Sequence, residues 1–114
     1  MTTETKWRKL LAWLRRNFPT KLPVTVRRVP YLRKREQCLG CCIREEDGFT
    51  ILIDANKPFY VQAETVCHEW THARIWEYEQ TMDHNDHYWI QYGEIYRLWD
   101  AWDYGRAKPT DTED

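Results

Sequence analysis

The sequence predicts one α+β domain, in which a helix precedes a small three-stranded sheet and two further helices follow it. Its length of 114 residues suits one domain. Hydrophobic residues make up 42% of the chain and charged residues 31%, as in folded globular proteins. Apolar residues recur at helical spacing near the N-terminus, alternate in the middle, and return to helical spacing afterwards. We expect the domain to occupy residues 1–105 and residues 106–114 to form a flexible acidic tail.

The first predicted helix covers residues 4–18. Its apolar side chains fall on one face, and most other positions are Lys or Arg. That face consists of Trp7, Leu10, Leu11, Leu14 and Phe18. Pro19 and Pro23 follow the helix and should end it. We expect this helix to cover one face of the sheet.

Three strands are predicted at residues 24–32, 37–44 and 49–54. The first contains Pro30, which favours an edge position or a bend because proline cannot donate a hydrogen bond to a neighbouring strand. The second and third strands are separated by a turn that contains Asp47-Gly48, a strong signal for a β-hairpin. The sequence therefore predicts antiparallel pairing between the last two strands.

Two helices are predicted at residues 60–80 and 86–104, with a polar break between them at 81–86. In the last helix, large apolar residues recur at helical spacing. They are Tyr88, Tyr92, Ile95, Trp99 and Trp102. We interpret this stripe as part of the core and not as a cofactor site.

The net charge of −1 hides an uneven distribution of charge. Residues 1–36 carry eleven Lys or Arg and two Glu, for a net charge of +9, whereas residues 37–114 have a net charge of −10. In one interpretation the basic residues only neutralise the acidic remainder of the fold. In the other, residues 6–35 make weak contact with nucleic acid.

The chain contains four cysteines and no apolar run of the roughly 20 residues that span a bilayer. Without an export signal, we expect Cys38, Cys41, Cys42 and Cys67 to be reduced thiols of a cytoplasmic protein that does not bind membranes. Cys38 and Cys41 have C-x-x-C spacing, but a second such pair is missing. Buried structural cysteines are therefore the expected interpretation.

The segment from His68 to His72 has the pattern H-E-x-x-H and lies inside the second predicted helix. Residues four apart lie on the same face of a helix, so the two imidazoles can reach one ion. Neutral imidazole is a good zinc ligand, and Glu69 between them is placed to act on water. The pattern therefore predicts a zinc site with His68 and His72 as ligands and Glu69 as the catalytic base.

A catalytic zinc site takes a third protein ligand and leaves one position open. The only other histidines are His84 and His87, both close to the start of the last helix. A thermolysin-like arrangement would instead use a glutamate from a later helix, for which Glu94 is the candidate. These three residues remain alternatives on spacing alone.

The motif and the residues after it resemble the SprT-like zincin metallopeptidases, which include small phage-encoded relatives. The resemblance covers residues 49–97 and rests on HEWTH, on HNDHY from His84 to Tyr88, and on YGEIYR from Tyr92 to Arg97. It implies a minimal zincin-like fold, His84 as the third zinc ligand and Tyr88 at the family's aromatic position. The chain departs from the family at Asn85, where glycine is usual.

The resemblance implies a zinc metallopeptidase that hydrolyses a protein or peptide substrate in the cytoplasm, or in the host cytoplasm if the chain is phage-encoded. Tyr92 and Tyr96 are candidates to stabilise the oxyanion. As in similar zincins, the strand at 49–54 is expected to offer its edge to an extended peptide. Two alternatives are a nucleic-acid-binding module with a structural zinc site and a zinc hydrolase that does not cleave peptides.

Overall fold

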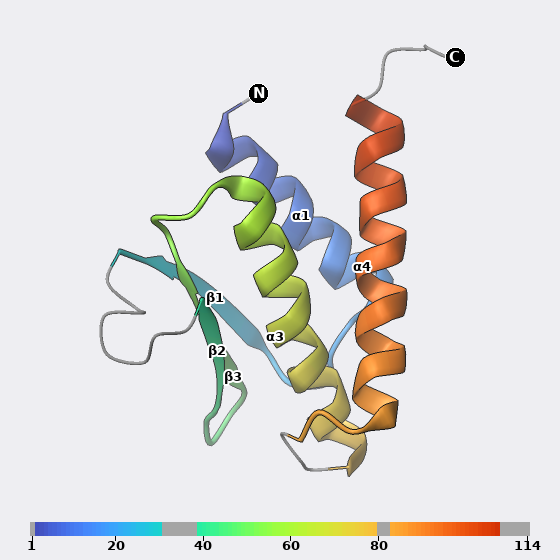
Figure 1. Cartoon of the computed structure of the whole chain (residues 1–114). Coiled ribbons are helices and arrows are strands. Elements are labelled where there is room, and N and C mark those ends of the chain that lie inside the picture. The colour runs from blue at the N-terminus through green and yellow to red at the C-terminus, as the bar shows by residue number, and fades with distance from the viewer. Residues whose placement is uncertain (1, 31–38, 80–82, 108–114) are drawn as a thin grey trace.

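The computed structural model describes residues 2–30, 39–79 and 83–107, and it confirms a small α+β domain (Figure 1). A helix comes first, three strands follow, and two long helices complete the described chain. These elements are α1 (Thr3–Asn17), β1 (Val24–Val29), β2 (Gly40–Arg44), β3 (Phe49–Asp54), α3 (Phe59–Glu79) and α4 (Asp86–Ala107). Among the described residues, no helix is both long and apolar enough to cross a membrane.

The element boundaries differ from the predicted ones mainly at the strand ends. β1 ends at Val29, because the backbone turns at Pro30. The remainder of the predicted first strand (31–32) and the start of the second (37–38) lie outside the described residues. α4 continues to Ala107, two residues beyond the predicted end of the domain. The predicted flexible tail falls largely on residues 108–114, which also lie outside the described part.

The sheet has the strand order β1-β3-β2, so β3 is its central strand. β1 pairs with β3 in parallel, with Val26 opposite Ile51, and β2 pairs with β3 antiparallel through the predicted hairpin. The expectation that the strand at 49–54 offers its edge to a peptide is therefore wrong. Both edges of β3 are hydrogen-bonded to neighbours, and β1 and β2 form the edges of the sheet.

Alternation along β3 separates a buried face from a half-exposed one. Phe49, Ile51 and Ile53 are buried, whereas Thr50 and Leu52 on the opposite face are half-buried. The buried face packs against α3, which also contacts α1 and α4 and is therefore the central helix (Figure 1). The helix that carries the H-E-x-x-H motif is thus held from several sides.

The N-terminal helix buries the predicted apolar face. Trp7, Leu10 and Leu14 are buried in the core, and Leu11 packs against it. Two indole N–H groups form hydrogen bonds that connect α3 to α1 and to the segment directly after α1. Trp7 Nε1 donates to Gln62 Oε1 at 3.0 Å, and Trp70 Nε1 donates to the Phe18 carbonyl at 2.8 Å. These buried donors are satisfied, so they position α1 without leaving an unpaired polar group.

The hairpin that joins β2 to β3 depends on glycine at position 48. Phe49 N donates to the Pro23 carbonyl at 2.9 Å, which brings the two backbones together beside Gly48. A Cβ atom on Gly48 would lie 2.4 Å from that carbonyl oxygen. Only a residue without a side chain fits this close approach, so Gly48 sets the start of the central strand against the start of β1.

Candidate metal centre

The H-E-x-x-H segment lies in the middle of α3, on the side of this helix that contacts the start of α4. His68 is half-buried, and Glu69 and His72 are only 7% and 8% exposed. The i and i+4 spacing places both imidazoles on the same side of the helix, with ring centroids 5.5 Å apart. The local pair that the sequence predicts is therefore present.

His84 comes to this pair from the segment that precedes α4. Its ring centroid lies 5.0 Å from that of His68 and 4.8 Å from that of His72. The next residue, Asn85, caps α4, since its side-chain oxygen accepts a hydrogen bond from Tyr88 N at 2.9 Å. Asn85 thus gives the helix a fixed start and holds His84 directly before it.

One nitrogen from each of the three histidines lies within 4.8 Å of the other two, which is close enough to hold one metal ion. His72 Nε2 and His84 Nε2 are 3.0 Å apart. Two imidazole nitrogens bound tetrahedrally to one zinc ion would be about 3.3 Å apart, given Zn–N bonds of about 2.05 Å. The separation of the His72 and His84 nitrogens is within about 0.3 Å of this value, and the His68 nitrogen lies within 4.8 Å of both.

The two histidines on α3 have the protonation state that a metal ligand needs. Burial, together with smaller electrostatic contributions from the neighbouring histidines of the cluster, lowers the pKa of both His68 and His72 to about 4. Both rings are therefore neutral at physiological pH and offer a lone pair. His72 Nδ1 is buried without a hydrogen-bond partner among the described residues. The donor set fits a divalent cation that accepts nitrogen ligands.

Glu69 lies beside the histidine cluster in an apolar environment. Its burial raises the pKa of its carboxyl group to about 7. A carboxyl with a pKa near neutrality can both take up and release a proton at physiological pH. Cys42 of β2 lies close enough to interact electrostatically with Glu69, and burial raises the pKa of this thiol to about 12. The thiol therefore stays protonated and adds no charge beside the carboxylate.

Tyr88 forms the floor of the cluster. It is fully buried, and its ring lies 4.6 Å from the His84 ring in a stacked arrangement and 4.7 Å from the His72 ring. Its hydroxyl donates to the His68 carbonyl at 3.0 Å. Tyr88 therefore connects α4 to the metal helix and fixes the rings of two of the three histidines.

The other two candidates for the third ligand lie outside this cluster. His87 is exposed in the first turn of α4, one residue before Tyr88. Glu94 is exposed two turns along α4 and accepts a hydrogen bond from Gln91 Nε2. Among the described residues, the cluster that could hold an ion contains only His68, His72 and His84.

A pocket of about 340 Å³ opens beside His68 and Glu69. Its wall is formed by the start of β2, by the two helical turns before the motif, and by α4. The lining residues are Leu39, Gly40, Val61, Glu64, Thr65, His68, Glu69 and Tyr92. The sequence predicted the strand that contains Gly40, but neither this strand nor Glu64 was expected to line the site. Glu64 precedes His68 by four residues and so shares its helix face, a signal that the spacing did contain.

Gly40 sets the distance between β2 and the metal helix. A Cβ atom at this position would lie 2.6 Å from Thr65 Cγ2 and 3.0 Å from the Leu52 carbonyl oxygen. The strand therefore lies directly against the helix turn that precedes His68. This contact places the start of β2 at the rim of the pocket.

The described cysteines match the expected burial only in part. Cys41 and Cys42 are half-buried on β2 and Cys67 is buried in α3, and none of the three forms a disulfide bond. Burial raises the pKa of the Cys67 thiol to about 12, so it too stays protonated. Cys38 lies outside the described residues.

The chain was also compared with known proteins. It matches no protein-family model, no curated protein and no solved structure.

Proposed function

We propose that this protein is a zinc-dependent metallopeptidase of the SprT-like kind. The observation that carries the proposal is the convergence of His68, His72 and His84 beside the buried carboxyl group of Glu69. Three histidine ligands with a general base next to them are the components of a zinc hydrolase. The 340 Å³ pocket beside Glu69 supplies room for a substrate.

Zinc is the metal that best suits these ligands. Imidazole nitrogens favour zinc and other late transition metals over calcium or magnesium, which prefer oxygen. Three protein ligands leave one position open, as in catalytic zinc sites. When bound, zinc supplies a Lewis acid that activates water and polarises the scissile carbonyl.

Glu69 performs the proton transfers in this proposal. Its carboxylate accepts a proton from water as the water oxygen bonds to the carbonyl carbon of the peptide. It then delivers this proton to the peptide nitrogen as the C–N bond breaks, which gives a carboxylic acid and an amine. The positive charge of a bound cation lowers the pKa of a nearby carboxyl group. A bound cation would therefore lower the pKa of Glu69 from the value of about 7 that it has in the metal-free site.

The pocket and the edge of the sheet favour an extended peptide as the substrate. Among the described residues, β2 pairs only with β3, and its first residues reach the rim of the pocket. An extended peptide can add to such an edge through backbone hydrogen bonds. Tyr92 lines the pocket, with its ring centroid 5.4 Å from that of His68, and is preferred over Tyr96 as the group that stabilises the oxyanion.

The alternative of a structural zinc site in a binding module is less well supported. Structural sites are usually closed by four protein ligands. His87 would have to be the fourth histidine, but it does not belong to the cluster formed by the described residues. The pocket beside Glu69 would also have no role in a purely structural site.

The proposal can be tested by measuring metal content and protein cleavage on the same preparation. We expect one zinc ion per chain and cleavage of a denatured protein such as casein that stops on chelation and returns with zinc. Zinc binding without cleavage of any peptide or protein substrate would favour the structural alternative. Absence of zinc binding would overturn the assignment of the site.

A further inference from the structure

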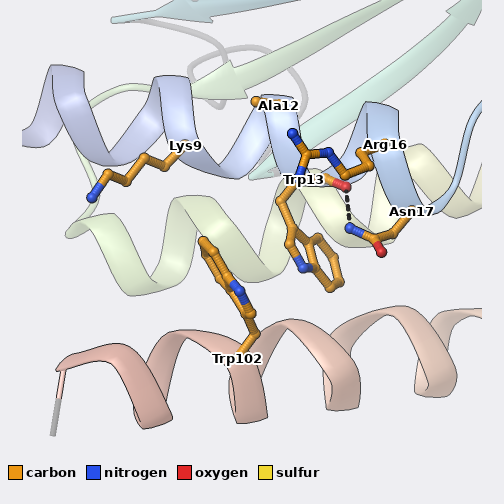
Figure 2. A pocket seen from close by; sticks show the side chains of 6 residues that line it. All are labelled: Lys9, Ala12, Trp13, Arg16, Asn17 and Trp102. Carbon is orange, nitrogen blue, oxygen red and sulfur yellow. Dashed lines mark hydrogen bonds between the residues drawn. The ribbon is translucent and has the colours of Figure 1, made fainter.

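A second pocket lies on the surface between α1 and α4, away from the histidine cluster. Its volume is about 340 Å³, and its lining residues are Lys9, Ala12, Trp13, Arg16, Asn17 and Trp102. Figure 2 shows the indoles of Trp13 and Trp102 projecting toward each other from the two helices. None of the six lining residues is acidic, so the pocket combines aromatic surface with positive charge.

The positive charge of this pocket is not neutralised within the described structure. Lys9 and Arg16 form no ion pair or hydrogen bond with any described residue. They are seven residues apart on α1, which corresponds to about 10 Å along the helix axis. Trp13 lies between them along α1; in Figure 2 the Arg16 guanidinium lies beside Trp13, whereas the Lys9 side chain extends away from the two indoles at the other end of the pocket. Within the described residues, these two basic side chains therefore do not neutralise an acidic side chain by direct ion pairing.

The aromatic part of the pocket is held in place by its neighbours. The Trp102 ring lies 5.2 Å from Trp99 and 6.2 Å from Trp13 between ring centroids. Trp99 is buried, whereas Trp13 and Trp102 are half-buried and keep part of their surface on the pocket. The Asn17 side chain donates to the Trp13 carbonyl at 2.9 Å and completes the end of α1. The indoles therefore form a fixed platform and need no ordering when a ligand binds.

We propose that this pocket binds a segment of single-stranded nucleic acid. A base would stack on the indole platform of Trp13 and Trp102, and the phosphates on either side of it would contact Lys9 and Arg16. Grooves that combine cations with aromatic rings are typical of proteins that bind single strands. A duplex hides the faces of its bases, and an acidic peptide has no need of two indole faces.

The proposed site is separate from the metal centre and does not depend on the proposed peptidase activity. Trp102 follows Tyr88 by fourteen residues on α4, or about 21 Å along the helix axis. A strand bound at the pocket would therefore leave the histidine cluster and its pocket open. Failure of one site would not affect the test of the other.

The first test measures binding of a fluorescently labelled oligothymidylate by anisotropy at several salt concentrations. We compare the full chain with the double variant Lys9→Ala/Arg16→Ala and with the matched control Arg27→Ala/Arg97→Ala, which removes the same charge at exposed positions elsewhere. The pocket variant should lower the log–log salt slope by about 1.4, since each lost contact to a single strand removes about 0.7. The control variant should keep the slope of the unaltered chain.

A second variant tests the indole platform. Trp102→Leu should weaken binding about five-fold or more while leaving the salt slope unchanged, because stacking on an aromatic ring is lost and phosphate contacts remain. The matched control is Trp89→Leu, since Trp89 is 49% exposed and lies outside the pocket. Circular dichroism confirms that each variant is folded. If Trp102→Leu does not fold, the comparison of Lys9→Ala/Arg16→Ala with Arg27→Ala/Arg97→Ala decides the outcome.

Three results would overturn the proposal. The first is no binding of the oligothymidylate at low salt. The second is equal loss of binding in the two double variants, which would indicate diffuse attraction without a site. The third is competition by a duplex or a polyglutamate peptide as strong as that by the unlabelled single strand, which would indicate another occupant.

Discussion

His72 and His84 face each other through their Nε2 atoms at 3.0 Å, although twelve residues and the end of a helix separate them along the chain. His72 belongs to α3, whereas His84 precedes α4. The cluster is therefore complete only when the start of α4 is docked against α3. Tyr88 maintains this docking, because it packs on both rings and bonds to the backbone of His68.

Replacing Glu69 with glutamine separates catalysis from metal binding. Glu69→Gln preserves the shape of the side chain but cannot accept the proton from water, so we expect cleavage to be abolished while zinc remains bound. Metal analysis and a cleavage assay on the same sample check this. His68→Ala is the control and should lose the metal. Equal metal loss in the two variants would show that Glu69 is itself a ligand.

Three alanine variants test which residue is the third metal ligand. His84→Ala should lower zinc affinity by orders of magnitude and remove activity. His87→Ala should reduce affinity by no more than the roughly 10- to 100-fold typical of supporting residues. Glu94→Ala should have no effect on the metal. Competition with a zinc chelator measures all three affinities, and loss of metal only in Glu94→Ala would indicate a thermolysin-like site.

Asn85 is expected to stabilise the fold by capping the N-terminus of α4. Asn85→Ala should lower the free energy of unfolding by about 1 kcal/mol, because Tyr88 N loses its capping partner. Asn85→Gly should cost only about a few tenths of a kcal/mol, since glycine is also tolerated at this position. Urea unfolding in the presence of a chelator measures both. A larger loss in the glycine variant would contradict the capping role.

The stability of the metal-free protein should rise with pH between about 4.5 and 6.5. The pKa values of His68 and His72 are lowered from 6.5 to about 4, so in this range the unfolded chain binds protons that the folded chain does not. Stability from these groups is therefore present above 6.5 and is lost as the pH falls toward 4. Glu69 acts in the opposite direction, because its pKa is raised from 4.5 to about 7 and its contribution is lost as the pH rises.

Between pH 4.5 and 6.5 the two histidines together raise the stability more than Glu69 lowers it, so the net change is a rise. Urea unfolding of the chelated protein at several pH values should show the rise in stability. Glu69→Gln should make it steeper, and His68→Ala should make it shallower. If stability fell between pH 4.5 and 6.5 and neither substitution altered the slope, the two histidines would not be buried as neutral rings.

Local sequence patterns were sufficient to predict most of the helices. The apolar face of α1 and the aromatic stripe of α4 both become core, since Leu10, Leu14, Ile95 and Trp99 are buried. The metal helix could be placed because the spacing of His68 and His72 is meaningful only in a helix. These features depend on residues within two turns of each other, which is the range over which periodicity is informative.

The parts that could not be predicted depend on contacts between distant segments. The parallel pairing of β1 with β3 places the strand at 49–54 in the centre, and no local pattern indicates strand order. The choice between His84 and His87 required the rotation of α4, which Asn85 and Tyr88 determine together. Trp102 could be assigned to the core stripe, but its position opposite Lys9 and Arg16 became visible only once α1 and α4 were placed together.

The contact between Gly40 and Thr65 has a consequence for how the sequence can vary in evolution. Gly40→Ala alone would place a methyl group 2.6 Å from Thr65 Cγ2. Serine at position 65 would remove that methyl group and keep the hydroxyl that donates to the Val61 carbonyl at 2.7 Å. The Leu52 carbonyl oxygen would still lie 3.0 Å from the new Cβ atom. In homologous chains we therefore expect glycine to predominate at position 40, and alanine there to be accompanied by serine or another small residue at position 65.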